Sequence, residues 1–163
     1  MGNTPLNVVL ILTDQQRATG PYDSEGMRAF HSQYLPHQNA LRAAGWDFDQ
    51  HRIVSSACVP SRASLFTGLP AATHGVFNTD GFAKQDGDAG LHWLDPDTHP
   101  TLGHYARTLG IQTAYLGKWH LSPTPLPDAV AQSTPNPNDD EAWAQLTKSY
   151  AAENLLNPFG FDD

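Results

Sequence analysis

The side chains most suited to chemistry lie in three short segments of this sequence. These segments are a polar pair after an aliphatic run, a stretch that begins at the single cysteine, and a Lys-Trp-His sequence, and their relevant residues are Asp14, Gln15, Cys58, Arg62, Lys118 and His120. A carboxylate and an amide oxygen suit hard cations such as Ca²⁺, Mg²⁺ or Mn²⁺. Arginine and lysine can bind an anionic small molecule within an otherwise acidic protein. A lone cysteine is most often a small buried hydrophobe, so the residues around it decide its role.

Residues 58–68 carry the strongest chemical signal in the chain. They read Cys-Val-Pro-Ser-Arg-Ala-Ser-Leu-Phe-Thr-Gly, which resembles the C-x-P-S-R-x-x-x-x-T-G signature of the sulfatase family at every fixed position. The resemblance implies that a maturation enzyme oxidises Cys58 to formylglycine, whose hydrated aldehyde attacks the sulfur of a sulfate ester. It also implies that Arg62 binds and orients this nucleophile with its planar guanidinium. The expected activity is therefore sulfuric ester hydrolysis by covalent catalysis.

The polar pair Asp14-Gln15 directly follows the aliphatic run 7–13. In sulfatases an acidic pair at the end of the first strand binds a divalent cation, and Asp-Gln resembles a variant of that pair. The resemblance implies that Asp14, Gln15 and the modified Cys58 are metal ligands, with Ca²⁺ as the expected ion and Mn²⁺ or Mg²⁺ as alternatives. Without the resemblance, an isolated Asp at this place is more often a turn residue or a helix N-cap.

The third segment, 117–120, reads Gly-Lys-Trp-His and resembles a G-K-W-H element of the same family. Residues two apart on an extended backbone share a face, so Lys118 and His120 can point into one cleft. The resemblance implies that Lys118 binds the sulfate oxygens and that His120 exchanges a proton with the nucleophile. A further histidine shortly after the signature, His74, is interpreted as a structural support of the nucleophile segment.

Hydrophobic patterning indicates the elements that hold these segments. A buried strand is predicted over 7–13, a second sheet strand over 111–116, and a strand or an extended segment over 46–54. Helices are predicted over 34–44, 61–67, 101–109 and 140–156. This alternation indicates an α/β domain with a mostly parallel sheet flanked by helices. The sulfatase resemblance implies the alkaline-phosphatase-like form of that architecture. In open sheets of this kind ligands bind at the carboxyl ends of the strands, which is where the polar pair is expected to lie.

The composition limits the classes of partner. Seventeen acidic and nine basic side chains give a net charge of −8, and Lys and Arg form no run. A nucleic-acid partner is therefore not expected, and an acidic surface disfavours anionic membranes. The N-terminal segment has no basic region and only a short apolar run, so neither a signal peptide nor a membrane span is expected, and the chain is predicted to be cytoplasmic. The expected partners are a small sulfate ester and the maturation enzyme.

The sulfatase resemblance runs from Asn7 to Asp163 and makes 1–163 the N-terminal part of a single catalytic domain, with no separate second domain. The second carboxylate pair, a further His and a further Lys of the family are not among these residues. We therefore expect an incomplete sheet, an incomplete metal site and no activity from these 163 residues alone. Two alternatives stay open: a phosphonate or phosphate ester hydrolase of the same superfamily, and a non-catalytic truncated remnant.

Overall fold

The computed structural model describes residues 7–17, 20–48, 50–80 and 90–123, together with 140–141, 144–145, 148, 152 and 154–162. The chain divides into two compact units, residues 1–52 and 53–163, and each is described by itself. Among the described residues no helix is long and apolar enough to cross a membrane.

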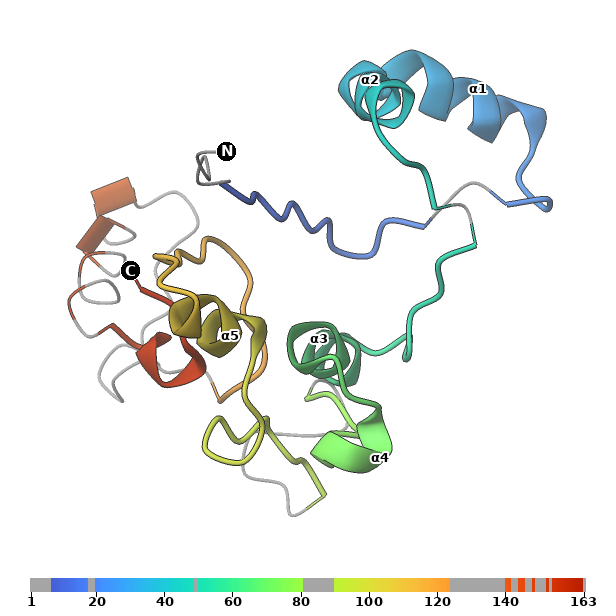
Figure 1. Ribbon diagram of the computed structural model, residues 1–163. Helices are drawn as coiled ribbons and strands as arrows, with labels where there is room; N and C mark the ends of the chain where they lie inside the picture. The colour runs from blue at the N-terminus through green and yellow to red at the C-terminus, as the bar shows by residue number, and fades with distance from the viewer. Residues whose placement is uncertain are drawn as a thin grey trace, which may run out of the picture. The chain divides into compact units, whose positions relative to one another are not determined.

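The first unit contains two helices, α1 (Glu25–Tyr34) and α2 (Pro36–Ala44), which Figure 1 shows in blue and cyan. The side chain of Ser24 caps α1 by accepting a hydrogen bond from the backbone N–H of Met27 at 3.1 Å. Proline disfavours helical backbone in the residue before it, and Leu35 accordingly separates the two helices with φ −117° and ψ 53°. The predicted helix 34–44 is thus confirmed over 36–44, whereas α1 was not predicted.

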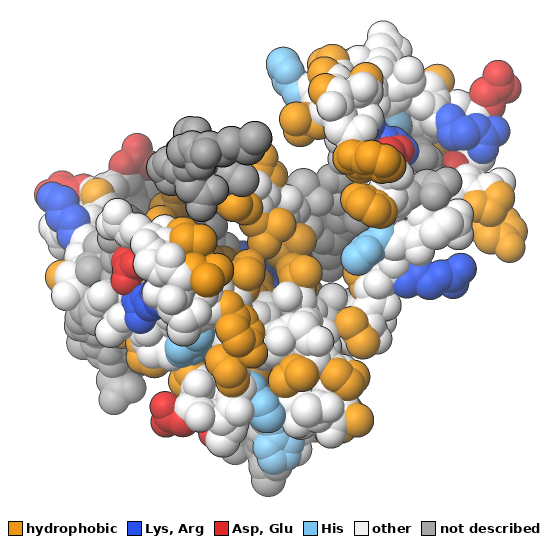
Figure 2. Space-filling model, in the orientation of Figure 1, with side chains coloured by type: hydrophobic (Ala, Val, Ile, Leu, Met, Phe, Trp, Pro, Cys, Tyr) orange, Lys and Arg blue, Asp and Glu red, His pale blue; other side chains and the backbone are white. Residues whose placement is uncertain are grey.

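The aliphatic run 7–13 forms no strand in the described part of the first unit. Its side chains from Val8 to Leu12 are 46–85% exposed, and Figure 2 shows hydrophobic side chains at the surface of both units. A strand needs a neighbouring backbone that accepts and donates its ladder hydrogen bonds. Because the described part of the first unit provides no such pairing for this run, its composition alone does not produce a strand.

In the second unit the helices with described bounds are α3 (Cys58–Thr67), α4 (Ala71–His74), α5 (Leu102–Thr108) and the 3₁₀ turn η1 (Asn157–Phe159). Helix α3 begins three residues before the predicted start at Ser61, because Pro60 falls in the first turn, where a backbone N–H has no helical partner to lose. It ends at Gly68, whose φ of 71° is the left-handed conformation that closes many helices. The predicted helix 101–109 corresponds closely to α5.

The core of the second unit joins α3 to residues from the end of the chain. It consists of Val59, Ala63, Phe66, Val76, Leu94, Trp119, Leu121, Leu156, Phe159 and Phe161. Aromatic rings dominate the contacts, with Trp119 centred 5.4 Å from Phe66 and 4.9 Å from Phe159. Tilted and edge-on aromatic pairs of this kind add to the stability given by burial itself. The core therefore holds α3 against the segment that carries Lys118 and His120.

The strand predicted over 111–116 is also not formed in the described residues, and the described positions of 46–54, predicted as a strand or an extended segment, form no strand. One isolated parallel bridge, between Ala114 and Asp162, is the β pairing found there. Of the helix predicted over 140–156, the described positions 140–141, 144–145, 148 and 152 are helical, and the other positions up to 153 lie outside the described residues. The helical predictions thus hold better than the predicted sheet, which the described residues do not confirm.

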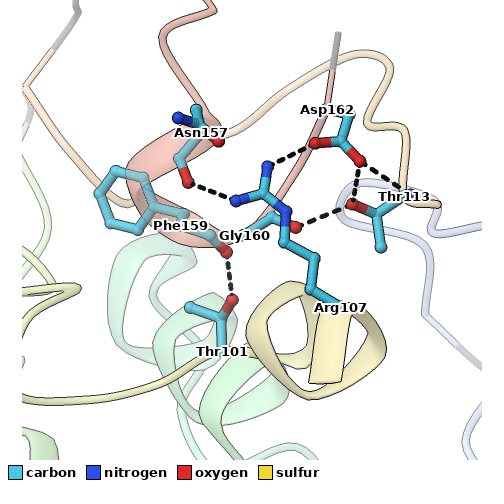
Figure 3. A network of polar contacts seen from close by, with 7 residues as sticks. All are labelled: Thr101, Arg107, Thr113, Asn157, Phe159, Gly160 and Asp162. Atoms are coloured by element: carbon cyan, nitrogen blue, oxygen red, sulfur yellow. Dashed lines mark hydrogen bonds and ion pairs between the residues drawn. The ribbon is translucent and has the colours of Figure 1, made fainter. Parts of the chain in front are cut away.

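A polar network fixes the last described segment beside α5 (Figure 3). Arg107 pairs with Asp162 at 2.6 Å and also donates to the carbonyl of Asn157, while Thr101 donates to the carbonyl of Phe159. The backbone N–H of Thr113 and then the Arg107 guanidinium hold the pKa of Asp162 below its ordinary value. These hydrogen bonds complete the core by holding Phe159 and its neighbours in place.

Two glycines allow this segment to approach α5 closely. A Cβ atom added at Gly103 would lie 2.6 Å from the carbonyl oxygen of Gly160, and one added at Gly160 would lie 2.2 Å from the backbone nitrogen of His104. Any side chain at either position therefore collides with backbone. Gly160 also has φ 84°, which other residues rarely adopt.

Candidate active site

The nucleophile candidate lies at the beginning of α3. Cys58 is the first residue of that helix and is half-buried. The Nζ atom of Lys118 approaches its Sγ atom to 3.7 Å, although the two residues are 60 apart in the sequence. The structure therefore brings together the predicted nucleophile and the predicted sulfate-binding lysine.

Arg62 lies one turn after Cys58 on the same helix and is buried, with 7% of its surface exposed. Its Nη1 atom donates to the backbone carbonyl of Lys118 at 2.7 Å and to the hydroxyl of Tyr115 at 3.3 Å. The Tyr115 hydroxyl also donates to the same Lys118 carbonyl. These contacts tie the nucleophile helix to the lysine segment. That Arg62 orients the nucleophile itself stays a prediction.

Tyr115 was not among the predicted site residues. In the sequence it is an apolar-patterned residue three positions before Lys118 and belongs to no motif. Its ring packs against Phe66 and Trp119, with centroids 5.8 and 5.1 Å apart. Only the folded chain shows that its hydroxyl reaches Arg62.

The segment 117–120 is not the extended strand end that the sequence predicted. Gly117 has φ 98° and His120 has φ 58°, both in the left-handed region, and no strand is formed at these described positions. The expectation that Lys118 and His120 share a face because of strand alternation is therefore wrong in its premise. Buried Trp119 fixes the segment, while the Lys118 side chain lies at the surface and His120 is half-buried.

His120 contacts an acidic residue that the sequence did not single out. Its Nε2 atom lies 2.5 Å from Oδ1 of Asp80, which is 40 residues earlier in the chain. A carboxylate can only accept a hydrogen bond, so Nε2 carries the hydrogen in this arrangement. Such a carboxylate partner fixes the rotation of the imidazole ring. No sequence motif links Asp80 to His120, because the contact depends on the path of the intervening chain.

Asp14 and Gln15 belong to the first unit, whereas the other four predicted site residues belong to the second. Both are exposed, and Gln15 has a left-handed φ of 55°. Their oxygen atoms suit a hard cation, but Ca²⁺ takes about six to eight ligands. The described residues contain no group of three or more His, Cys, Asp or Glu that could hold a metal ion. This donor pair therefore fits the chemistry of the predicted metal but supplies only part of a ligand set.

His74 supports the nucleophile helix from α4, in agreement with its predicted structural role. It is buried, its Nε2 atom lies 2.9 Å from the Ser64 hydroxyl on α3, and its Nδ1 atom accepts from the backbone N–H of Val76 at 3.1 Å. An Nδ1 atom that accepts a hydrogen bond is unprotonated, so Nε2 is the donor. Burial is the main cause that lowers the pKa of His74, and the charge of His99 adds to it.

We expect acidification to destabilise the protein through His74. Burial in the folded state disfavours the charged ring, so the pKa of His74 there lies below the ordinary value of 6.5 that it regains on unfolding. The unfolded state then binds more protons, and stability falls as the pH drops below that ordinary value, until the pH passes the folded-state pKa. The free energy of unfolding, measured by urea between about pH 7.5 and pH 5.5, should decrease.

His74→Gln should remove part of this decrease and should also lower stability at neutral pH by about 1–3 kcal/mol, because Val76 or Ser64 loses its partner. His92→Gln is the matched control, since His92 is exposed. An unchanged pH dependence in His74→Gln would contradict the assignment.

Comparison with known proteins defines the family of this chain. A sequence model described as Sulfatase matches residues 6–158, so the chain belongs to the sulfatase family. It is 32% identical over 118 residues to the ulvan-active sulfatase of Formosa agariphila, and this alignment covers 72% of this chain and 20% of that protein. It is 30% identical over 122 residues to arylsulfatase A of Bos taurus, covering 75% of this chain and 22% of the relative. It is 27% identical over 126 residues to N-acetylgalactosamine-6-sulfatase of Homo sapiens, and this alignment covers 74% of this chain and 23% of the relative.

The chain thus spans about 20% of the length of the first curated relatives that it matches. No solved structure matches it. Sulfatase membership implies an alkaline-phosphatase-like fold, although the described residues alone are mostly helical.

Proposed function

We propose that this protein hydrolyses sulfate esters and that a formylglycine made from Cys58 is its nucleophile. The observation that carries the proposal is the geometry of the signature cysteine. Cys58 begins α3, and a lysine ammonium lies 3.7 Å from its sulfur. A cation at that distance from the nucleophile suits an anionic ester, because it attracts the substrate and offsets the charge that develops in the transition state.

The proposed reaction proceeds through a displacement at sulfur followed by an elimination. One hydroxyl of the hydrated aldehyde attacks the sulfur and gives up its proton. The bond between sulfur and the ester oxygen breaks, and this oxygen takes up a proton and leaves as the alcohol. The second hydroxyl then loses its proton, the carbon–oxygen bond to the sulfate breaks, and the aldehyde forms again. Water adds to the aldehyde to restore the diol. Covalent catalysis of this kind divides one difficult step into two easier ones.

Three side chains of the second unit take defined parts in this proposal. Lys118 binds the sulfate oxygens, because its ammonium already lies beside the nucleophile position. Arg62, one turn along α3, orients the nucleophile and holds the Lys118 backbone. His120 accepts the proton of the second hydroxyl, with its ring held by Asp80.

The proposed metal is Ca²⁺, with Asp14, Gln15 and the modified Cys58 among its ligands. The support for this assignment is the chemistry of the donors, since a carboxylate and an amide oxygen are hard ligands. When bound, the cation supplies positive charge against the oxygens of the sulfate group. We also propose that the protein forms the mostly parallel sheet that the family fold implies.

Expression of the full-length protein from its native gene, rather than of residues 1–163 alone, together with a formylglycine-generating enzyme tests the proposal. We expect peptide mass spectrometry to find the aldehyde at Cys58. We also expect the purified protein to hydrolyse an aryl sulfate and to lose this activity in the presence of a chelator. An aryl phosphate assayed in parallel tests for the related phosphate ester hydrolases. A cysteine that stays unmodified beside a competent maturation enzyme would refute the proposed nucleophile, and turnover of phosphate alone would refute the proposed substrate class.

A further inference from the structure

We infer that the hydroxyl of Tyr115 positions Lys118 for sulfate binding, so that Tyr115 is a positioning residue of the active site. This inference rests on the proposed function, because it concerns the lysine that binds the sulfate group. It assigns a task to a residue that belongs to no part of the signature.

The first observation is a three-way hydrogen-bonded junction at the backbone of Lys118. The carbonyl oxygen of Lys118 accepts from Arg62 Nη1 at 2.7 Å and also from the Tyr115 hydroxyl. Arg62 Nη1 lies 3.3 Å from the Tyr115 hydroxyl oxygen, so the three groups contact one another in pairs. Hydrogen bonds to a charged group are stronger than those between neutral groups. The junction therefore links α3 directly to the backbone that carries Lys118.

The second observation is that the tyrosine ring is itself held in place. Its centroid lies 5.8 Å from Phe66, 5.1 Å from Trp119 and 5.5 Å from Phe161, and these three side chains belong to the buried core. A hydroxyl on a ring packed in this way has little freedom to move. Tyr115 thus transmits the rigidity of the core to the surface segment 117–120.

The third observation is the exposure of the lysine side chain. Lys118 is exposed, yet its Nζ atom lies 3.7 Å from Cys58 Sγ. A lysine side chain has a flexible four-carbon stem, so the fold controls the position of its ammonium mainly through the backbone. Gly117, with φ 98°, precedes it and adds little stiffness of its own. Loss of the junction should therefore move the ammonium away from the reacting group, and misplacement by about 1 Å can cost about a hundredfold in rate.

Tyr115→Phe tests the inference because it removes the hydroxyl and keeps the ring. We expect kcat/KM for an aryl sulfate to fall about tenfold, which corresponds to about 1.4 kcal/mol, since Arg62 still holds the carbonyl. Tyr105→Phe is the matched control, because Tyr105 is an exposed tyrosine on α5. The thermal midpoint of each variant is measured to show that the fold is kept.

A second measurement reports on the position of Lys118 without any activity. In protein expressed without the maturation enzyme, Cys58 stays a thiol, and succinimidyl iodoacetate can join it to a neighbouring amine. Peptide mass spectrometry then measures the yield of the Lys118–Cys58 link. We expect a high yield in the wild type and in Tyr105→Phe, and a lower yield in Tyr115→Phe.

The two measurements separate this inference from the proposed function. A lower cross-link yield together with lower kcat/KM supports the inference. An unchanged yield overturns it, whatever happens to activity, because the hydroxyl then does not hold Lys118. A lower yield with unchanged kcat/KM also overturns it, since the position of Lys118 then does not affect the reaction. If the wild type hydrolyses no sulfate ester, the proposed function fails, while the cross-link yield still decides whether the hydroxyl holds Lys118.

Discussion

Replacement of Cys58 by alanine should abolish sulfate ester hydrolysis, with a loss of at least about a thousandfold in kcat. The physical reason is that the proposed nucleophile is the hydrated aldehyde derived from this residue, and alanine offers no atom that can become one. Alanine is well suited to a helix, so α3, which begins at Cys58, should form unchanged. The measurement is the initial rate on an aryl sulfate, with the protein produced beside the maturation enzyme.

Cys58→Ser provides the control for this experiment. Serine keeps a hydroxyl near the place of the thiol but is not a substrate of a cysteine-specific maturation enzyme, so its activity should stay as low as that of the alanine variant. Recovery of activity in Cys58→Ser after expression with a maturation system that accepts serine would show that the aldehyde is what matters. Wild-type turnover in Cys58→Ala would contradict the proposed mechanism.

Replacement of Lys118 by methionine should lower kcat/KM for sulfate esters by about a hundredfold or more. The ammonium lies 3.7 Å from Cys58 Sγ, where it can offset charge on the sulfate group in the transition state. Loss of one preorganised electrostatic contact commonly has an effect of about this size. Methionine keeps an unbranched apolar stem, and the backbone carbonyl of residue 118 can still accept from Arg62 and Tyr115. The change therefore removes the charge and leaves the segment anchored.

Lys148→Met is the matched control, since Lys148 is an exposed lysine outside the site and its loss removes the same net charge. Its kinetic constants should stay close to those of the wild type. Measurement of both variants at low and high salt separates a local contact from long-range attraction, because salt screens the long-range effect over about 10 Å. Equal losses in the two lysine variants would show that Lys118 acts only through net charge.

The contacts of two histidines show which features of this site the sequence predicts and which it does not. His74 follows the signature closely in the sequence, and the structural role predicted for it agrees with its burial and its contacts with Ser64 and Val76. The partner of His120 is Asp80, 40 residues away, and no local pattern points to that contact. Local spacing predicts neighbours on one helix well, but it does not predict which distant residue meets a given side chain.

The same distinction between local and distant contacts separates the secondary-structure predictions that were confirmed from those that were not. Helices α2 and α5 agree with their predicted ranges, because proline and glycine positions and apolar spacing act within a few residues. Helix α1 was missed, although Ser24 caps it and Met27, Phe30 and Tyr34 recur at helical spacing, and none of its side chains is buried. The strands predicted over 7–13 and 111–116 depend on partners elsewhere in a chain, and in the described residues their pairing is limited to the bridge between Ala114 and Asp162.

The family of this protein and the candidate for its nucleophile can be derived from the order of its residues, because the signature from Cys58 to Gly68 is contiguous and its helix is defined locally. The residues that place Lys118 beside Cys58 cannot be derived from the order of residues alone. Tyr115 and Arg62 meet at the Lys118 carbonyl only because Phe66, Trp119 and Phe161 pack into one core that brings α3 against the segment 117–120. Side-chain packing between segments about 50 residues apart decides that contact, since burial of aromatic surface acts through space and has no period along the chain.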